Sequence, residues 1–278
     1  SRGGRAADDG IYSPRLPHVI QICEGVPMSR ISGRPAISNE HIYGLSLRVA
    51  RWRAGTPGTP LLFLNGIGAD LVAAAPLLAQ IHDREVWTLD MPGVGGSPDA
   101  LLPYGAPTIA AVVMEIADRL GHKMIDVAGF SWGGALAQQI AIQFPGRVRR
   151  LVLMATTPVM GAPGIGWAAM FDDDMLASGL KIQTATPLGI AYQSAAMIGW
   201  SSVGFLSGLK ELPALVLMGE QDGVMPACYG EMLADQIDGA VLEMVPGSHL
   251  FPFTHAAAIS ARISAFLDQP APAEQAAA

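Results

Sequence analysis

The chain has 278 residues, of which 50% are hydrophobic and only 15% are charged. This composition provides enough apolar material for a buried core and excludes a disordered or collagen-like chain. Lys and Arg number 17 against 24 Asp and Glu, and no basic stripe could neutralise a run of phosphates, so nucleic-acid binding is disfavoured. The two cysteines, Cys23 and Cys228, have neither metal-ligand spacing nor the density of a disulfide framework.

A low charged fraction means that the surface exposes more apolar area than most, which favours a lipid-like, polymeric or protein partner. The first ten residues lack the pattern of a secretory signal, and we therefore expect a cytoplasmic protein. The uncharged stretch 182–209 is long enough to span a membrane, but Gln183, Pro187 and Gln193 interrupt it. We interpret it as a buried or lid segment, and no membrane span is expected.

Regular structure is expected from residue 45 onward. Residues 1–40 are rich in Gly, Pro, Arg and Ser and predict a loosely ordered extension with one short strand at 18–23. Apolar periodicity then predicts strands and helices in alternation: strands 45–52 and 61–64, helix 73–81, strand 86–89, helix 108–120 and strand 124–128. Such alternation predicts a mostly parallel sheet with helices on both faces.

The second half continues the alternation but contains one long gap. A helix from about Gly133, in which apolar residues recur every four positions, precedes a strand at 150–155. Later elements are the strands 214–218 and 241–245 and a last helix bearing Ile259, Ile263, Phe266 and Leu267. We therefore predict a core formed by 41–158 and 213–268, a small cap, 159–212, inserted between two late strands, and a flexible tail, 269–278.

The strongest chemical pattern is a G-x-S-x-G pentapeptide, Gly129 to Gly133, between the predicted strand 124–128 and the following helix. A tight strand-to-helix turn needs small residues there, because side chains at Gly129 and Gly133 would collide with neighbouring elements. Such a turn exposes the hydroxyl of Ser131 at a helix N-terminus. Ser131 is the candidate nucleophile, and a plain structural turn is the alternative.

A serine hydroxyl needs a base to take its proton and an acid to orient that base. Asp222 and His249 each lie just beyond a predicted strand, and functional side chains gather at the carboxyl edge of such a sheet. Glu220 is the alternative acid, but it lies closer to the strand end, and His255, the alternative base, begins the last helix. We interpret the histidines that precede the nucleophile as ordinary surface or core residues: His18, His41, His82 and His122.

Negative charge developing on a carbonyl oxygen is stabilised by two backbone N–H donors. The first is expected from Trp132, which follows the nucleophile, and the second from Ile67, in the glycine-rich turn 65–70 after the strand 61–64. A plain turn without a catalytic role is the alternative for this segment.

Three further segments attract attention. The glycine-rich stretch 90–97 lacks the Gly-Lys-Ser/Thr ending of a phosphate loop, and we interpret it as a rim of the pocket. The acidic run 172–174 is interpreted as a helix start, and no metal site is expected. In the cap, Trp167, Phe171 and Trp200 are candidate substrate-binding residues, with packing on the core as an equal alternative.

These segments resemble the α/β-hydrolase superfamily and, more narrowly, the intracellular poly(3-hydroxyalkanoate) depolymerases. The resemblance rests on the stretches 62–69, 90–97, 131–139, 198–200 and 247–251, with Asn65 and the pair Ser131-Trp132 as its more specific features. It implies the α/β-hydrolase fold, Ser131 as nucleophile with Asp222 and His249 as its partners, and a polyester of 3-hydroxy acids as substrate.

The leading hypothesis is a serine hydrolase that cleaves hydroxyalkanoate esters without a cofactor, in the cytoplasm or at the surface of a storage granule. A general carboxylesterase or lipase, or a hydrolase of carbon–carbon bonds, would use the same residues. A non-catalytic binding protein on a hydrolase scaffold is the alternative from another class.

Overall fold

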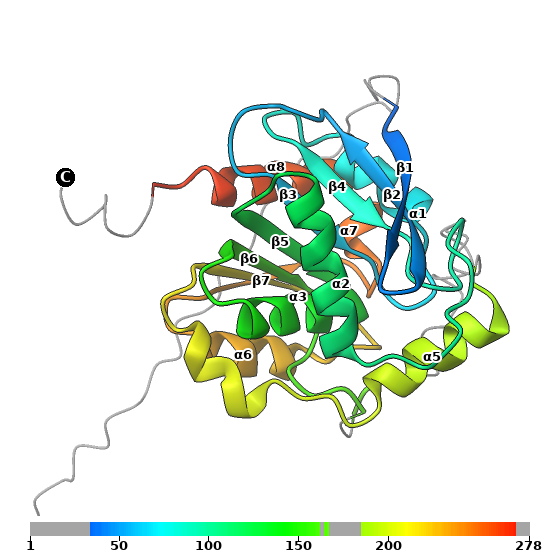
Figure 1. The fold of residues 1–278 in the computed structure, drawn as a ribbon. Coiled ribbons are helices and arrows are strands. Elements are labelled where there is room, and N and C mark those ends of the chain that lie inside the picture. The colour runs from blue at the N-terminus through cyan, green and yellow to red at the C-terminus, as the bar shows by residue number, and fades with distance from the viewer. Residues whose placement is uncertain (1–33, 162–163, 167–184, 271–278) are drawn as a thin grey trace, which may run out of the picture.

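The computed structural model describes residues 34–161, 164–166 and 185–270. These residues form an eight-stranded sheet in the order β1-β2-β4-β3-β5-β6-β7-β8 (Figure 1). The strands are β1 (Ala36–Ile42), β2 (Leu45–Trp52), β3 (Leu61–Leu64), β4 (Val86–Leu89), β5 (Ile125–Phe130), β6 (Val148–Met154), β7 (Ala214–Gly219) and β8 (Val241–Val245). β1 and β2 are antiparallel to their neighbours and all other pairings are parallel, which confirms the predicted mostly parallel sheet.

Helices cover both faces of this sheet (Figure 1). One face packs against α2 (Ala106–Arg119), α3 (Trp132–Gln143) and α6 (Ala227–Gln236). The other packs against α1 (Leu71–Leu78), α7 (Phe251–Thr254) and α8 (Ala256–Leu267). β3 shows why its sequence is a continuous apolar run: Leu62 and Leu64 enter the first core, and Leu61 and Phe63 enter the second.

The elements that the sequence did not predict include β1 and α6. β1 begins at Ala36, inside the segment predicted to be a loosely ordered extension, and of its residues only Ile42 is buried. α6 buries Tyr229, Gly230 and Leu233, too few apolar side chains for a clear helical stripe. Both elements lie at places where little apolar surface is covered, so hydrophobic periodicity could not reveal them.

The segment between β6 and β7 contains α5 (Pro187–Met197) and the 3-10 helix η3 (Val203–Leu209). Thr186 caps the N-terminus of α5, and its Oγ1 accepts a hydrogen bond from Gly189 N–H. The predicted strand at 18–23 and the cap residues Trp167 and Phe171 lie outside the described residues, and the division into extension, core, cap and tail stays a prediction. Among the helices that the structure describes, none has both the length and the apolar character to cross a membrane.

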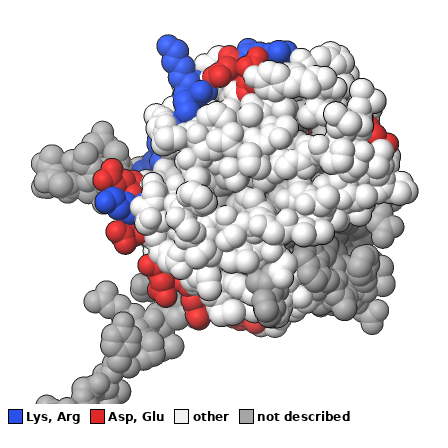
Figure 2. Space-filling model, turned by 60° about the horizontal axis from the view of Figure 1, so that its bottom comes forward, with Lys and Arg blue, Asp and Glu red and all other residues white. Residues whose placement is uncertain are grey.

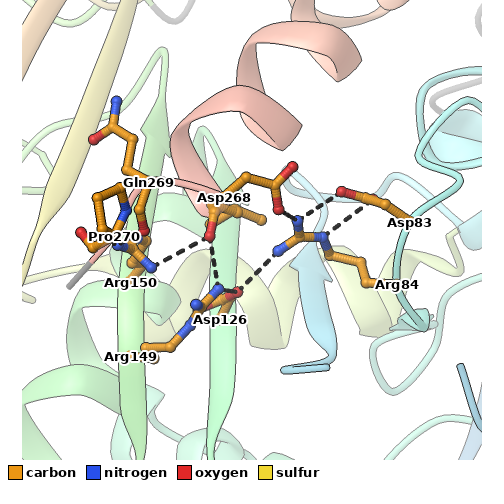
Figure 3. A network of polar contacts seen from close by, with 9 residues as sticks. Asp83, Arg84, Asp126, Arg149, Arg150, Asp268, Gln269 and Pro270 are labelled. Atoms are coloured by element: carbon orange, nitrogen blue, oxygen red, sulfur yellow. Dashed lines mark hydrogen bonds and ion pairs between the residues drawn. The ribbon is translucent and has the colours of Figure 1, made fainter. Parts of the chain in front are cut away.

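A network of ion pairs lies at the amino edge of the parallel strands (Figure 3). Asp126, at the start of β5, is completely buried and accepts two hydrogen bonds from Arg149, at 2.9 and 2.6 Å. Arg149 and Arg150 also donate to the carbonyl of Leu267, which ends α8. Burial raises the pKa of Asp126 despite the arginines around it. The network therefore connects the start of the sheet to the end of the last helix.

Candidate active site

The G-x-S-x-G pentapeptide forms a sharp turn from β5 into α3, as predicted. Ser131 has a φ of 53°, in the left-handed region that costs a non-glycine residue about 1–3 kcal/mol. A Cβ at Gly129 would lie 2.2 Å from the carbonyl oxygen of Gly133, and a Cβ at Gly133 would lie 2.0 Å from that of Leu64. Both flanking positions therefore require glycine, because the turn is pressed against α3 and β3.

The hydrogen bonds that the described residues make with Ser131 involve its backbone only. Its N–H donates to the carbonyl of Met154 at 2.9 Å, and its own carbonyl accepts from Thr156 Oγ1 at 2.7 Å. These contacts fix the turn from β6. The Oγ atom is bonded to none of the described residues, so the hydroxyl is available to another group.

Asp222 and His249 are brought together at the carboxyl edge, beyond β7 and β8. His249 Nδ1 lies 2.9 Å from Asp222 Oδ2, and both side chains are buried. Asp222 Oδ1 accepts hydrogen bonds from Val224 N–H and Met225 N–H, both at 2.8 Å, which fix the carboxylate. Because a carboxylate only accepts, Nδ1 carries the ring proton and Nε2 is free to act as a base.

The ring of Phe130 links this pair to the turn that holds Ser131. Its centroid lies 4.9 Å from that of His249, and Phe130 is the residue immediately before Ser131. The sequence analysis did not single out Phe130, which fills an unspecified position of the G-x-S-x-G pattern. Phe130 thus places the imidazole of His249 next to the turn that carries Ser131.

The alternative acid and base are placed differently. Glu220 is exposed and accepts a hydrogen bond from its neighbour Gln221. His255 Nδ1 lies 3.0 Å from Thr254 Oγ1, at the start of α8. His82 and His122 pair with Arg53 and Glu85, respectively. None of these histidines contacts Asp222.

The turn 65–70 lies directly against Ser131. A Cβ at Gly66 would be 3.1 Å from the ring of Phe130 and 3.4 Å from Ser131 Cβ. The N–H groups of Gly68 and Ala69 have acceptors, Gln193 Oε1 at 3.3 Å and the carbonyl of Gly66 at 3.3 Å. Neither Ile67 N–H nor Trp132 N–H is bonded to a described residue, so both remain available as donors.

The segment 90–97 supports this turn and does not form a phosphate cradle. Asp90 is fully buried, and its carboxylate accepts from Leu71 N–H at 2.7 Å and from Gly96 N–H at 2.9 Å. Burial raises the pKa of Asp90, although these two hydrogen bonds and Arg48 act in the opposite direction. The carboxylate of Asp90 thus links the start of α1, which follows the turn 65–70, to the loop that contains Gly96.

An apolar cavity of about 270 Å³ lies between that turn and the cap. It is lined by Ile67, Gly161, Ser194, Met197 and Ile198. Because Ile67 is also a candidate donor, a chain held in this cavity lies next to the atoms that would bind a developing oxyanion.

Trp200 is not part of this lining. Its ring packs edge-on against Trp132 with centroids 6.4 Å apart, and its Nε1 donates to Gln139 Oε1 at 3.0 Å. The structure therefore places the side chain of Trp200 against α3. Trp167 and Phe171 lie outside the described residues.

The described part of the segment between β6 and β7 exposes several large apolar side chains. α5 and the segment after it expose Leu188, Ile190, Ile198 and Phe205. Figure 2 shows the side toward which α5 lies in Figure 1: its middle is free of Lys, Arg, Asp and Glu, which gather along the margin. In the described ranges, no group of three or more His, Cys, Asp or Glu side chains could hold a metal ion.

A G-x-S-x-G turn between a parallel strand and a helix, with an Asp–His pair at the same sheet edge, is typical of an α/β hydrolase. The family model described as "alpha/beta hydrolase fold" matches residues 59–188. The chain is 35% identical over 248 residues to the poly(3-hydroxyalkanoate) depolymerase of Ectopseudomonas oleovorans, covering 78% of this chain and 87% of that one. The chain therefore belongs to the α/β-hydrolase family and resembles the poly(3-hydroxyalkanoate) depolymerases.

Other relatives have different names. The 2-hydroxymuconate semialdehyde hydrolase of Pseudomonas sp. strain CF600 is 30% identical over 249 residues, which cover 76% of this chain and 87% of that one. The crystal structure of the enol-lactonase from Burkholderia xenovorans LB400 superposes with a TM-score of 0.73 at 21% identity, covering 84% of this chain and all of that one. The latter likeness concerns the fold alone.

Proposed function

We propose that the protein is a serine hydrolase that cleaves the ester bonds of a poly(3-hydroxyalkanoate) or its oligomers. The observation that carries the proposal is the Asp222–His249 pair at the same sheet edge as the strained turn that presents Ser131. The 35% identical depolymerase supports the choice of substrate.

In the proposed reaction, Ser131 Oγ attacks the ester carbonyl carbon while His249 Nε2 takes its proton. Asp222 holds Nδ1–H and stabilises the imidazolium that forms. The tetrahedral oxyanion accepts hydrogen bonds from Trp132 N–H and Ile67 N–H. His249 then returns the proton to the departing hydroxyl end of the polymer.

The acyl-enzyme that remains is hydrolysed by water in a second cycle of the same kind. His249 takes a proton from the water as it attacks, and Ser131 Oγ leaves with that proton. Every step uses protein groups and water, so the scheme has no role for a cofactor.

The cap supports an apolar substrate. Its cavity adjoins Ile67, and α5 and η3 expose further apolar side chains. A surface without charges can lie against a water-insoluble polymer without desolvating ions. We extend the proposal to a cytoplasmic enzyme acting at the surface of storage granules, which fractionation with purified granules would test.

A soluble ester or a carbon–carbon bond next to a carbonyl is the second candidate substrate. The semialdehyde hydrolase, 30% identical over most of the chain, supports it. The catalytic residues would be the same, so only substrate turnover distinguishes the two.

The test measures the release of hydroxyacids from amorphous granules of polyhydroxyalkanoates with short or medium side chains. Hydrolysis of p-nitrophenyl butyrate and octanoate is measured in parallel. Ser131→Ala should fold normally and lose nearly all turnover, whereas Ser260→Ala, which changes a buried serine of α8, should retain it. Turnover of soluble esters alone favours the second candidate. Activity that survives in Ser131→Ala, or failure of a fluorophosphonate to label Ser131, refutes the serine mechanism.

A further inference from the structure

α5 carries a glutamine that is completely buried, Gln193. Its Oε1 accepts a hydrogen bond from Gly68 N–H at 3.3 Å, and its Nε2 donates to the carbonyl of Gly189 at 3.4 Å. The first contact joins the cap to the turn 65–70, across 125 positions of the chain. The second joins the side chain to the preceding turn of its own helix.

These two partners determine the orientation of the amide. Gly68 offers an N–H and Gly189 offers a carbonyl, so Oε1 has to face Gly68 and Nε2 has to face Gly189. A flipped amide would place a donor against a donor and an acceptor against an acceptor. The side chain at position 193 therefore has to offer both an acceptor and a donor, as an amide does.

The turn that Gln193 contacts holds one of the two expected oxyanion donors. Gly68 directly follows Ile67, and Gly66 packs against the ring of Phe130 and Ser131 Cβ. Engaging Gly68 N–H fixes the peptide plane next to that of Ile67 and leaves Ile67 N–H as a donor. A buried N–H without an acceptor would instead rotate toward another partner.

We propose that Gln193 is a positioning residue, which holds the turn 65–70 so that Ile67 N–H points at the oxyanion. The inference rests on the proposed serine mechanism. It makes the cap part of the oxyanion machinery as well as the wall of a substrate pocket, since Ser194 and Met197 of the same helix line the cavity beside Ile67.

The helix that carries Gln193 is itself fixed to the core. Thr186 N–H donates to the carbonyl of Gly93 at 2.8 Å, and Ala185 bridges Val94. A Cβ at Gly189 would lie 2.6 Å from the carbonyl oxygen of Gly93, so the backbones are in close contact there. Gln193 therefore projects from a rigid support, as a positioning residue must.

The variant Gln193→Met keeps the length of the side chain but removes the acceptor. Ser202→Ala is the matched control, because Ser202 Oγ makes another buried hydrogen bond between cap and core, to Gln138 Oε1 at 2.6 Å, away from the turn. We expect Gln193→Met to lower kcat for p-nitrophenyl butyrate by about ten- to a hundredfold with little change in KM. Affinity for a trifluoromethyl ketone, which forms an oxyanion on the enzyme, should fall with kcat/KM.

Hydrogen exchange of the peptide containing 65–70 provides a readout that needs no activity. Protection of this peptide should fall in Gln193→Met and stay unchanged in Ser202→Ala. Unchanged protection in Gln193→Met overturns the inference, even if the wild-type protein hydrolyses no ester and the serine mechanism fails. An equal loss of kcat in Ser202→Ala also overturns it.

A milder variant covers the case in which Gln193→Met does not fold. Gln193→Asn keeps the amide but shortens the side chain by one methylene, which moves the amide away from Gly68. It should lower kcat and the protection of the 65–70 peptide, as Gln193→Met does. If Gln193→Asn leaves both unchanged, the inference is wrong.

Discussion

Replacing Asp222 by asparagine tests the proposed base most directly, because the structure predicts which way the new amide will face. Oδ1 of Asp222 is committed to two backbone N–H donors, from Val224 and Met225. An asparagine oxygen has to occupy this position. Its NH₂ group then faces His249 Nδ1 at the place where Oδ2 now lies 2.9 Å away.

An NH₂ group donates, so Nδ1 of His249 has to accept and the ring proton moves to Nε2. Nε2 can then no longer take the proton of Ser131. In serine proteases the loss of this tautomer lowers kcat about 10⁴-fold, which corresponds to about 5.4 kcal/mol. The backbone hydrogen bonds survive in Asp222→Asn, so the free energy of unfolding should change little.

The assay is kcat for p-nitrophenyl butyrate together with thermal unfolding, with Glu220→Gln as the control for the exposed neighbouring acid. We expect Glu220→Gln to be fully active. The reasoning is refuted if Asp222→Asn retains more than about a tenth of wild-type kcat, or if Glu220→Gln is the more damaging change.

Two further predictions concern the turn and the ion network. Gly133→Ala should lower both the Tm and kcat, because the new Cβ would lie 2.0 Å from the carbonyl oxygen of Leu64, whereas Gly204→Ala, with nothing within 4 Å, should change neither. Arg149→Met should lower the free energy of unfolding by about 3 kcal/mol at neutral pH, since it leaves the buried carboxylate of Asp126 poorly paired. Burial already raises the pKa of Asp126, and loss of Arg149 should raise it further, so the deficit should be small where this carboxyl is protonated and grow as the pH rises. Arg119→Met, which breaks an exposed pair with Glu115, should change stability by less than about 0.5 kcal/mol.

The candidate catalytic residues could be proposed from the sequence because each lies next to a recognisable strand. Ser131 has glycines on both sides, and Asp222 and His249 each follow a buried apolar run, β7 or β8. Parallel strands bring such positions to one edge whatever the details of packing. The sequence favoured Asp222 over Glu220 only by distance from the strand end, and the structure adds that Asp222 contacts His249 whereas Glu220 is exposed.

Gln193 could not be identified as a functional residue in this way. In the sequence it is an uncharged polar residue in an apolar segment, which indicated only that the segment does not cross a membrane. Its partner, Gly68, lies in another part of the chain, and no local pattern records contacts of that range. β1 was missed for a related reason: its pairing with β2 is made by the backbone, and its side chains are mostly exposed.

The ion network at the amino edge has a consequence for how activity is lost. His249 stands at the start of the segment that continues through α7 and α8, and that segment ends at Leu267, whose carbonyl is held by Arg149 at 2.9 Å and Arg150 at 3.2 Å. Local opening of the last helix from its far end would release the loop that carries His249 while the sheet stays folded. Arg149 and Arg150, on the opposite edge of the sheet from Ser131, therefore help to hold the segment that carries His249.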